Sequence, residues 1–233
     1  MAVFAAKKHK NRRNIMKNPP EKSRENLGVL LSAVLAGVFI ATGGTVFLSL
    51  ENKVIGASLF AIGLFYVVSF KLWLYTGRIG YLPEKGADYP LKLLLTLIGN
   101  AIGTAGVALM LRASRIAPAI VEKASALSAV KLSDSLVSIF FLSIFCGMLM
   151  YVGVFGFAVF EHALGKYLSV YLAVSVFILC GFEHCVANIY YFTLANAWGD
   201  VRIWPAMAVM VIGNSVGSIL FAEANKLQKR IQE

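Results

Sequence analysis

The feature that most constrains this chain is a series of six long apolar stretches separated by polar segments. With 58% hydrophobic and only 15% charged residues, the composition excludes an ordinary soluble domain, whose surface needs more charge. A membrane-spanning helix needs roughly 20 apolar residues. The stretches occupy residues 27–49, 54–75, 91–112, 133–159, 167–197 and 204–225. The sequence therefore predicts an all-α polytopic membrane protein with six transmembrane helices.

These stretches divide the chain into three predicted parts. Residues 1–26 form a basic N-terminal segment, residues 27–225 a six-helix transmembrane domain, and residues 226–233 a short C-terminal tail. Lys and Arg are most frequent in the segments that alternating spans place on the same side as the termini. Because cytoplasmic segments carry the excess of Lys and Arg, we expect both termini in the cytoplasm.

Basic segments next to membrane spans have topology and anionic lipid to explain them. We therefore expect membrane lipid, and not nucleic acid, as the partner of the N-terminal segment. The first apolar stretch has no cleavage-like site and five more stretches follow it, which argues against a signal peptide. The expected location is the inner (plasma) membrane of a bacterium or archaeon, with several passes.

Two of the six stretches are interrupted. The fifth contains Gly-Phe-Glu-His-Cys-Val-Ala-Asn at 181–188, and glycines at 77 and 80 and then Pro83 interrupt the end of the second. Proline removes a helix donor, and transporters use broken helices to line their pathways. The second and fifth helices are therefore predicted to be broken. Three spans in each half indicate two inverted three-helix repeats, although the two halves show little direct similarity.

Glu183 and His184 are the strongest candidates for functional residues, because ionisable groups at hydrocarbon depth are costly. A buried histidine is more often a packed core residue, but the adjacent acid and the matching break at Thr76 favour a functional role. Cys185 and His184 are adjacent, and adjacent helix residues point about 100° apart, so the two do not form a catalytic pair unless the helix is broken there. The histidines and cysteines are scattered along the chain, so no metal or cofactor is expected.

These residues resemble the formate/nitrite transporter family. The resemblance rests on Gly-Phe-Glu-His-x-x-Ala-Asn at 181–188, Leu-Tyr-Thr-Gly at 74–77 and Gly-Asn-x-x-Gly at 99–103, and it extends from residue 23 to 225. It implies an aquaporin-like protomer and a homopentamer with one pore in each subunit. It also implies passage of small monovalent anions such as formate, nitrite or hydrosulfide, alone or with a proton.

The resemblance further implies which residues form the pore. His184 would be the central pore histidine, Thr76 the hydroxyl that faces it, and Lys131 the vestibule lysine. The apolar constrictions would be formed by Phe60, Leu64, Leu74 and Phe177. The chain departs from the family pattern at Lys71-Leu72-Trp73 and at Gly147, so we expect a divergent member.

Elementary chemistry assigns roles to the polar residues. A bare anion loses much hydration free energy between Leu and Phe side chains, whereas its neutral acid loses far less. Thr76 and His184 would bind the anion, and a proton would come from His184 or from water. Glu183 would orient His184 or a backbone turn, and Asn188 would satisfy backbone groups freed at the break. Lys71 would snorkel along its helix, pair with Glu183 or face the pore.

A second class of function stays open at this point. A polytopic membrane enzyme, or the membrane anchor of a redox complex, would also place polar groups inside apolar spans. Haem or quinone chemistry normally needs paired histidines on different spans, and only one histidine lies at membrane depth. We therefore expect a channel or transporter and no enzyme.

Overall fold

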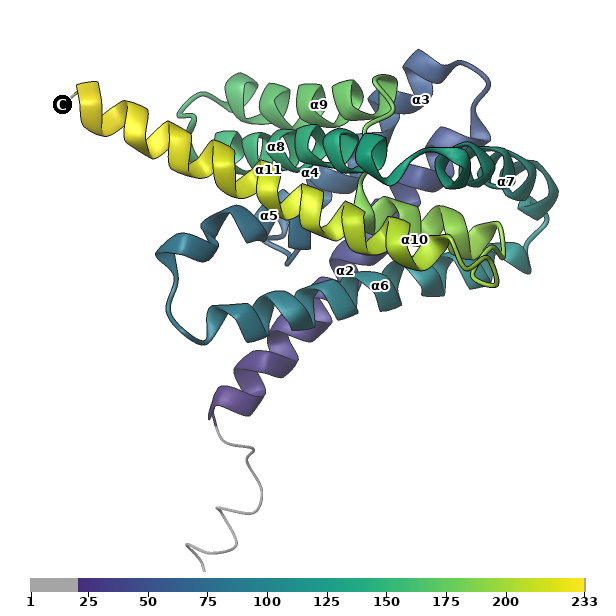
Figure 1. Ribbon diagram of the computed structural model, residues 1–233, viewed down its shortest axis with the longest axis horizontal. Coiled ribbons are helices and arrows are strands. Elements are labelled where there is room, and N and C mark those ends of the chain that lie inside the picture. Colours follow the sequence, from purple (N-terminus) through teal and green to yellow (C-terminus); the bar gives the residue numbers. More distant parts are fainter. Residues whose placement is uncertain (1–20, 233) are drawn as a thin grey trace, which may run out of the picture.

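The computed structural model describes residues 21–232, and over this range the chain forms helices and no strand (Figure 1). The elements are α2 (Glu21–Ser49), α3 (Lys53–Phe60), α4 (Ile62–Ser69), α5 (Tyr75–Arg78), the 3-10 helix η1 (Ile79–Glu84), α6 (Tyr89–Arg112), α7 (Ala117–Ser133), α8 (Leu136–Val159), α9 (Ala163–Leu179), α10 (Cys185–Leu194) and α11 (Ile203–Gln232). Most of the predicted N-terminal segment lies outside the described residues. The predicted C-terminal tail continues α11 as far as Gln232.

Four helices are long and apolar enough to cross a membrane, namely α2, α6, α8 and α11. The other two expected spans are assembled from shorter pieces, α3 to α5 in the first half and α9 with α10 in the second. The prediction that the second and fifth helices are broken is confirmed. The total of six spans stays a prediction, because the broken spans are built from helices shorter than a bilayer.

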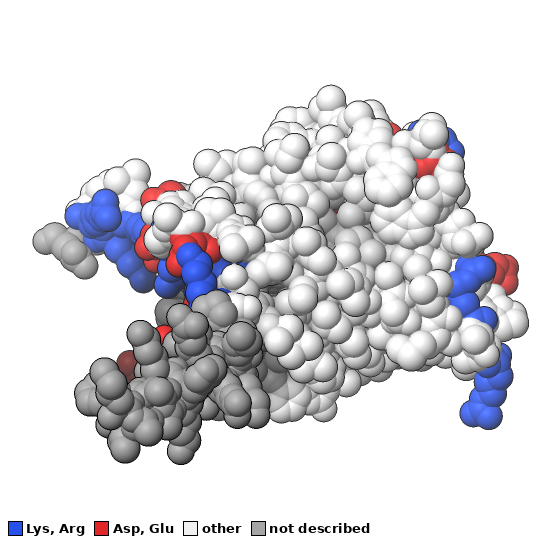
Figure 2. Space-filling model, turned by 90° about the horizontal axis from the view of Figure 1, so that it is seen from below, with Lys and Arg blue, Asp and Glu red and all other residues white. Residues whose placement is uncertain are grey.

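On the face that Figure 2 shows, charged side chains gather at two ends of the molecule, and we call the broad uncharged area between them the uncharged belt. We call the end where α2 begins and α11 ends the proximal end, and the end where α7 lies the distal end (Figure 1). At the proximal end, ion pairs join Lys22 to Asp88 at 2.7 Å and Lys226 to Glu84. The belt exposes large apolar side chains, which suits a hydrocarbon environment.

The two halves of the chain fold alike. In the first half α2 packs along α6, and in the second α8 packs along α11. Each pair is close because of a glycine: a side chain at Gly103 would overlap the carbonyl oxygen of Val34, and one at Gly217 that of Ile144. An odd number of spans in each repeat would reverse the direction of the chain, so the predicted three spans in each half correspond to inverted repeats.

Helix α7 was not expected from the sequence, in which residues 113–132 fall between the third and fourth predicted spans. Pro118 lies in its first turn, where the fixed φ of proline suits a helix start. Its buried residues recur every fourth position, at Ile120, Ala124, Ser128 and Leu132, and the helix packs on α10 and α2. Charged residues between them weaken the apolar pattern, which is why the helix was missed.

Candidate functional site

The two broken helices are interrupted in the same way. After α4, Lys71 has φ of 56°, and after α9, Gly181 has φ of 70°. In both turns the next N–H group donates to a carbonyl in the last turn of the preceding helix, at 2.8 and 2.9 Å, a common helix ending. Three residues then lead to the following helix. Leu74 and His184 therefore hold equivalent positions, immediately before α5 and α10.

Two asparagines from neighbouring helices hold the breaks open. Asn100 of α6 accepts from the N–H of Tyr75 at 2.9 Å and donates to the carbonyl two residues earlier at 2.9 Å. Asn214 of α11 makes the same two bonds around Cys185, at 2.9 and 2.8 Å. Both side chains are fully buried. Since unpaired backbone groups are costly in an apolar interior, these amides stabilise the interrupted backbone.

Sequence analysis assigned this role to Asn188, and the assignment is wrong. The Asn188 side chain donates to Oε2 of Glu183 at 2.6 Å, and the freed backbone groups are bound by Asn100 and Asn214. A signal for Asn214 was present: Gly-Asn-x-x-Gly at 99–103 recurs at 213–217. The repeat went unused because the halves were compared at their breaks and not at their third spans.

The two breaks meet at a hydrogen bond between Thr76 Oγ1 and His184 Nε2, 2.9 Å long. The other ring nitrogen, Nδ1, accepts from the backbone N–H of Ala187 at 3.0 Å and caps α10. Because Nδ1 uses its lone pair in this way, a neutral ring carries its hydrogen on Nε2 and donates to Thr76. The threonine hydroxyl keeps its own hydrogen for another acceptor. Both side chains are buried.

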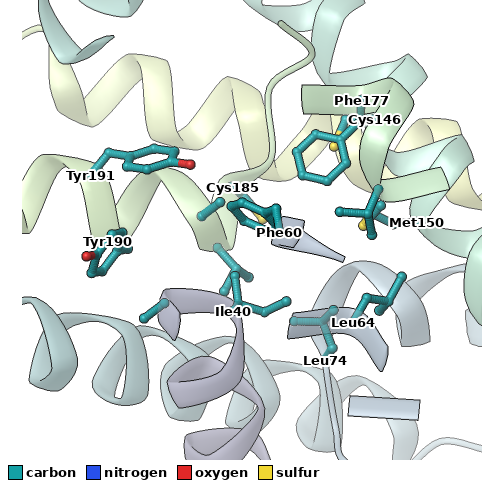
Figure 3. Close-up of a cluster of buried hydrophobic side chains, with 14 of the residues drawn as sticks. Ile40, Phe60, Leu64, Leu74, Cys146, Met150, Phe177, Cys185, Tyr190 and Tyr191 are labelled. Carbon is teal, nitrogen blue, oxygen red and sulfur yellow. The ribbon is translucent and has the colours of Figure 1, made fainter. Parts of the chain in front are cut away.

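Apolar side chains surround this pair. The His184 ring stacks on Phe177 with centroids 5.5 Å apart, and Phe177 meets Phe60 edge-on at 5.8 Å. Leu64 and Leu74 belong to the same buried cluster (Figure 3). The structure thus brings together the four residues expected to form constrictions, next to the Thr76–His184 pair. Their role in a pore stays a prediction.

A second polar group lies beside the histidine. Oε2 of Glu183 accepts from Lys131 Nζ at 2.7 Å and from Asn188 Nδ2 at 2.6 Å. The side chains of Lys131 and Glu183 are only 13% and 5% exposed, so each charge needs the other. Helix α7 supplies the lysine. Glu183 therefore binds α7 and α10 together, and its carboxylate bonds to these two partners and not to the His184 ring.

Lys71 is exposed and does not pair with Glu183, so one of its three interpretations is wrong. It lines a cavity of about 420 Å³ at the proximal end, together with Leu74 and Gly77. The inner wall of this cavity thus belongs to the first broken helix.

The geometry does not support the two other kinds of chemistry considered for the sequence, catalysis by Cys185 with His184 and metal binding. Both ring nitrogens of His184 are engaged, by Thr76 and by Ala187, so the ring does not activate the buried Cys185. Among residues 21–232, no group of three His, Cys, Asp or Glu side chains is placed to hold a metal ion. The arrangement is suited to hydrogen bonding of a small ligand in an apolar passage.

Comparison with known proteins gives this geometry a family. The model of the family described as "Formate/nitrite transporter" matches residues 13–225. Two curated relatives illustrate the similarity. The "Formate-nitrite transporter" of Plasmodium falciparum is 26% identical over 73% of this chain and 65% of its own length. The "Nitrite transporter NirC" of Salmonella typhimurium is 24% identical over 84% of this chain and 80% of its own length.

Solved structures share the fold. A pentameric formate channel with formate bound superposes with a TM-score of 0.70 at 18% identity, covering 90% of this chain and 97% of the channel. An ion channel of the FNT family gives a TM-score of 0.77 at 22% identity, covering 89% and 92%. With a family match over nearly the whole chain and two broken helices that meet at a buried threonine and histidine, the chain belongs to the formate/nitrite transporter family of anion channels and transporters.

Proposed function

We propose that the protein conducts small monovalent anions of weak acids, with formate, nitrite and hydrosulfide as candidates, through a pore in each protomer. The observation that carries this proposal is the buried hydrogen bond between Thr76 and His184 at the meeting point of the broken helices. Membership of the family supports the class of substrate.

We propose one path from the proximal to the distal end. It starts in the cavity at the proximal end and passes Leu74 and Leu64 to reach the Thr76–His184 pair. From there it continues between Phe60 and Phe177 to the distal end. Apolar residues lie on both sides of one polar step. An anion must lose its hydration to pass them, which costs free energy, so hydrated ions are excluded.

The polar step compensates for this loss. An anion that enters between Thr76 and His184 accepts hydrogen bonds from the threonine hydroxyl and from Nε2–H of the imidazole. A hydrogen bond to a charged group is worth about 1.5–3 kcal/mol. The Lys131–Glu183–Asn188 group lies next to this step and fixes the distal side of the break.

We further propose that a proton, where one accompanies the anion, comes from water. Nδ1 of His184 is the acceptor for the Ala187 N–H, so protonation at Nδ1 would remove the cap of α10. The imidazole is thereby held as a neutral donor. Its task is to bind the anion and its acid, and the neutral acid crosses the apolar constrictions at lower cost.

The assembly we propose is a homopentamer in a lipid membrane, with the proximal end in the cytoplasm. The pentameric formate channel of the same fold supports the stoichiometry, and the uncharged belt supports contact with lipid (Figure 2). The excess of Lys and Arg around the termini supports the orientation. The alternative of an enzyme or a redox anchor has no specific observation in its favour, since the matched proteins are transporters and channels.

Flux into proteoliposomes tests the proposal. Formate, nitrite, hydrosulfide and glycerol are compared at two external pH values, with empty liposomes as the control. We expect protein-dependent flux of at least one anion, faster at the lower pH, and none of glycerol. Flux of glycerol without any of the anions would contradict it. Light scattering in mild detergent is expected to give the mass of five 25.3 kDa chains.

A further inference from the structure

The cavity at the proximal end is positively charged and larger than a monovalent anion needs. Its volume is about 420 Å³, and a water molecule takes roughly 30 Å³ of liquid volume. Three cationic side chains line it: Lys71 from the turn after α4, Arg78 from the end of α5, and Lys166 from α9. Among residues 21–232, no carboxylate lines it. It lies within the usual range of ligand pockets, roughly 300–1,000 Å³.

Its charge is not used internally. At the distal end, three cations are neutralised by carboxylates, in the pairs Lys123–Glu51, Lys131–Glu183 and Arg202–Asp200. Hydrogen bonds from Arg202 lower the pKa of Asp200 to about 2, so that pair stays charged at any ordinary pH. In the part of the chain that the structure describes, Lys71, Arg78 and Lys166 form no such pair.

One of the cations is set in a defined position. The guanidinium of Arg78 lies over the Trp73 ring, 4.8 Å from its centroid, which restricts its orientation. Arginine presents a planar fork of donors that suits carboxylate and phosphate groups. Lys71 occupies a left-handed backbone conformation, where the other half of the molecule has glycine. Backbone strain of this kind, at a residue that lines a cavity, is typical of binding sites.

We propose that this cavity binds a small polyvalent anion, one with at least two separate phosphate or carboxylate groups. A monovalent anion would neutralise only one of the three cations. A polyvalent anion cannot follow the monovalent ones past Leu74, because the cost of desolvation rises with charge. Bound at the proximal mouth, it closes the path from that side. The closure rests on the proposed function, whereas the binding does not.

Calorimetry on the full-length protein in mild detergent tests the binding, with inorganic pyrophosphate and citrate as separate probes and ionic strength fixed by sodium chloride. We expect saturable binding of at least one probe. Lys71→Gly, Arg78→Gln and Lys166→Gln should each weaken it at least threefold, and the triple variant at least tenfold. The matched control is Lys123→Gln at the distal end, which should bind as the wild type does. The single variants decide the matter where the triple variant does not assemble.

Formate flux tests the closure. In liposomes of phosphatidylcholine alone, which offer no anionic headgroup, the probe that binds should slow formate flux more than sodium chloride of equal ionic strength. The triple variant should lose this difference, each variant being compared with its own flux without probe. Absence of binding by both probes, or equal binding by the triple variant, would overturn the site. Binding without slower flux would overturn the closure, and absence of formate flux would bear on the proposed function alone.

Discussion

The breaks in the two helices follow the same backbone course but contain different side chains. In each, a residue at positive φ is followed by three non-helical residues and a short helix, and an asparagine from the third span of the repeat binds the freed groups. The first break places a lysine, a tryptophan and a leucine at positions 71, 73 and 74. The second places a glycine, a glutamate and a histidine at 181, 183 and 184.

This difference indicates that the shared scaffold and the side chains of each break have different roles. The scaffold that holds the breaks open is duplicated, so it does not by itself determine what the pore binds. The buried carboxylate and the imidazole belong to the second break alone, and the carboxylate is bound by Lys131 of α7, a helix that was not recognised in the sequence. The first break contributes the hydroxyl of Thr76 and the cationic wall of the proximal cavity.

Replacing Asn100 or Asn214 should have the largest effect on the stability of the folded protein. Asn214→Leu leaves the N–H of Cys185 and the carbonyl of Glu183 buried without a partner, at about 1–3 kcal/mol for each group. Asn100→Leu does the same in the first half. We expect both variants to lose most of the folded oligomer, measured by size exclusion and thermal unfolding. If either variant is as stable as the wild type, the shared scaffold does not depend on that amide.

Breaking the ion pair between Lys131 and Glu183, which belongs to the second break, should have the next largest effect on stability. Lys131→Met leaves the Glu183 carboxylate buried and unpaired, which costs about 3–5 kcal/mol. Thermal unfolding should show a large drop in stability. The double variant Lys131→Met with Glu183→Gln should recover much of the loss, because no charge is then buried alone. An equal loss in the double variant would show that packing of α7, and not the charge, is at stake.

Exchanging the turn residues should give a smaller, reciprocal effect. Gly181→Ala places a side chain at φ of 70° without any steric overlap, so only backbone strain is added. We expect a loss of about 1 kcal/mol, and a gain of similar size from Lys71→Gly, since the left-handed conformation costs side chains about 1–2 kcal/mol. Chemical denaturation measures both. Changes of the same sign would contradict the equivalence of the two turns.

Removing the Thr76 hydroxyl should have the smallest effect on flux. Thr76→Val takes away one hydrogen bond to the anion, and because water replaces part of it, we expect a net loss of about 1 kcal/mol, roughly a fivefold change in rate. Thr76→Ser retains the hydroxyl and serves as the control. Formate flux in proteoliposomes measures the difference. Identical rates in both variants would remove Thr76 from the anion's binding step.

Local sequence signals were enough to predict the helical membrane fold and the two breaks, and the family resemblance supplied the residues that meet between them. Long apolar runs determine the spans. The Glu183-His184 pair indicates the second break without any knowledge of the contacts that these two residues make. The partner of Glu183 could not be read locally, because Lys131 lies 52 positions away on a helix whose apolar face is interrupted by charges. Asn214 was within reach, since its Gly-Asn-x-x-Gly repeats that of Asn100.

The central claim is that the second break supplies the donor that binds the anion, and its most direct test is to give that break the residue of the first. His184→Leu copies Leu74 and leaves the Asn214 scaffold in place, and His184→Asn is the control that retains both a donor and a helix cap. Formate flux is measured in proteoliposomes between about pH 5 and 8. We expect assembled His184→Leu to lose at least tenfold, and His184→Asn to retain part of the rate with the wild-type dependence on pH. Wild-type flux in His184→Leu would contradict the claim, and a flat pH profile in His184→Asn would show that the histidine itself supplies the proton.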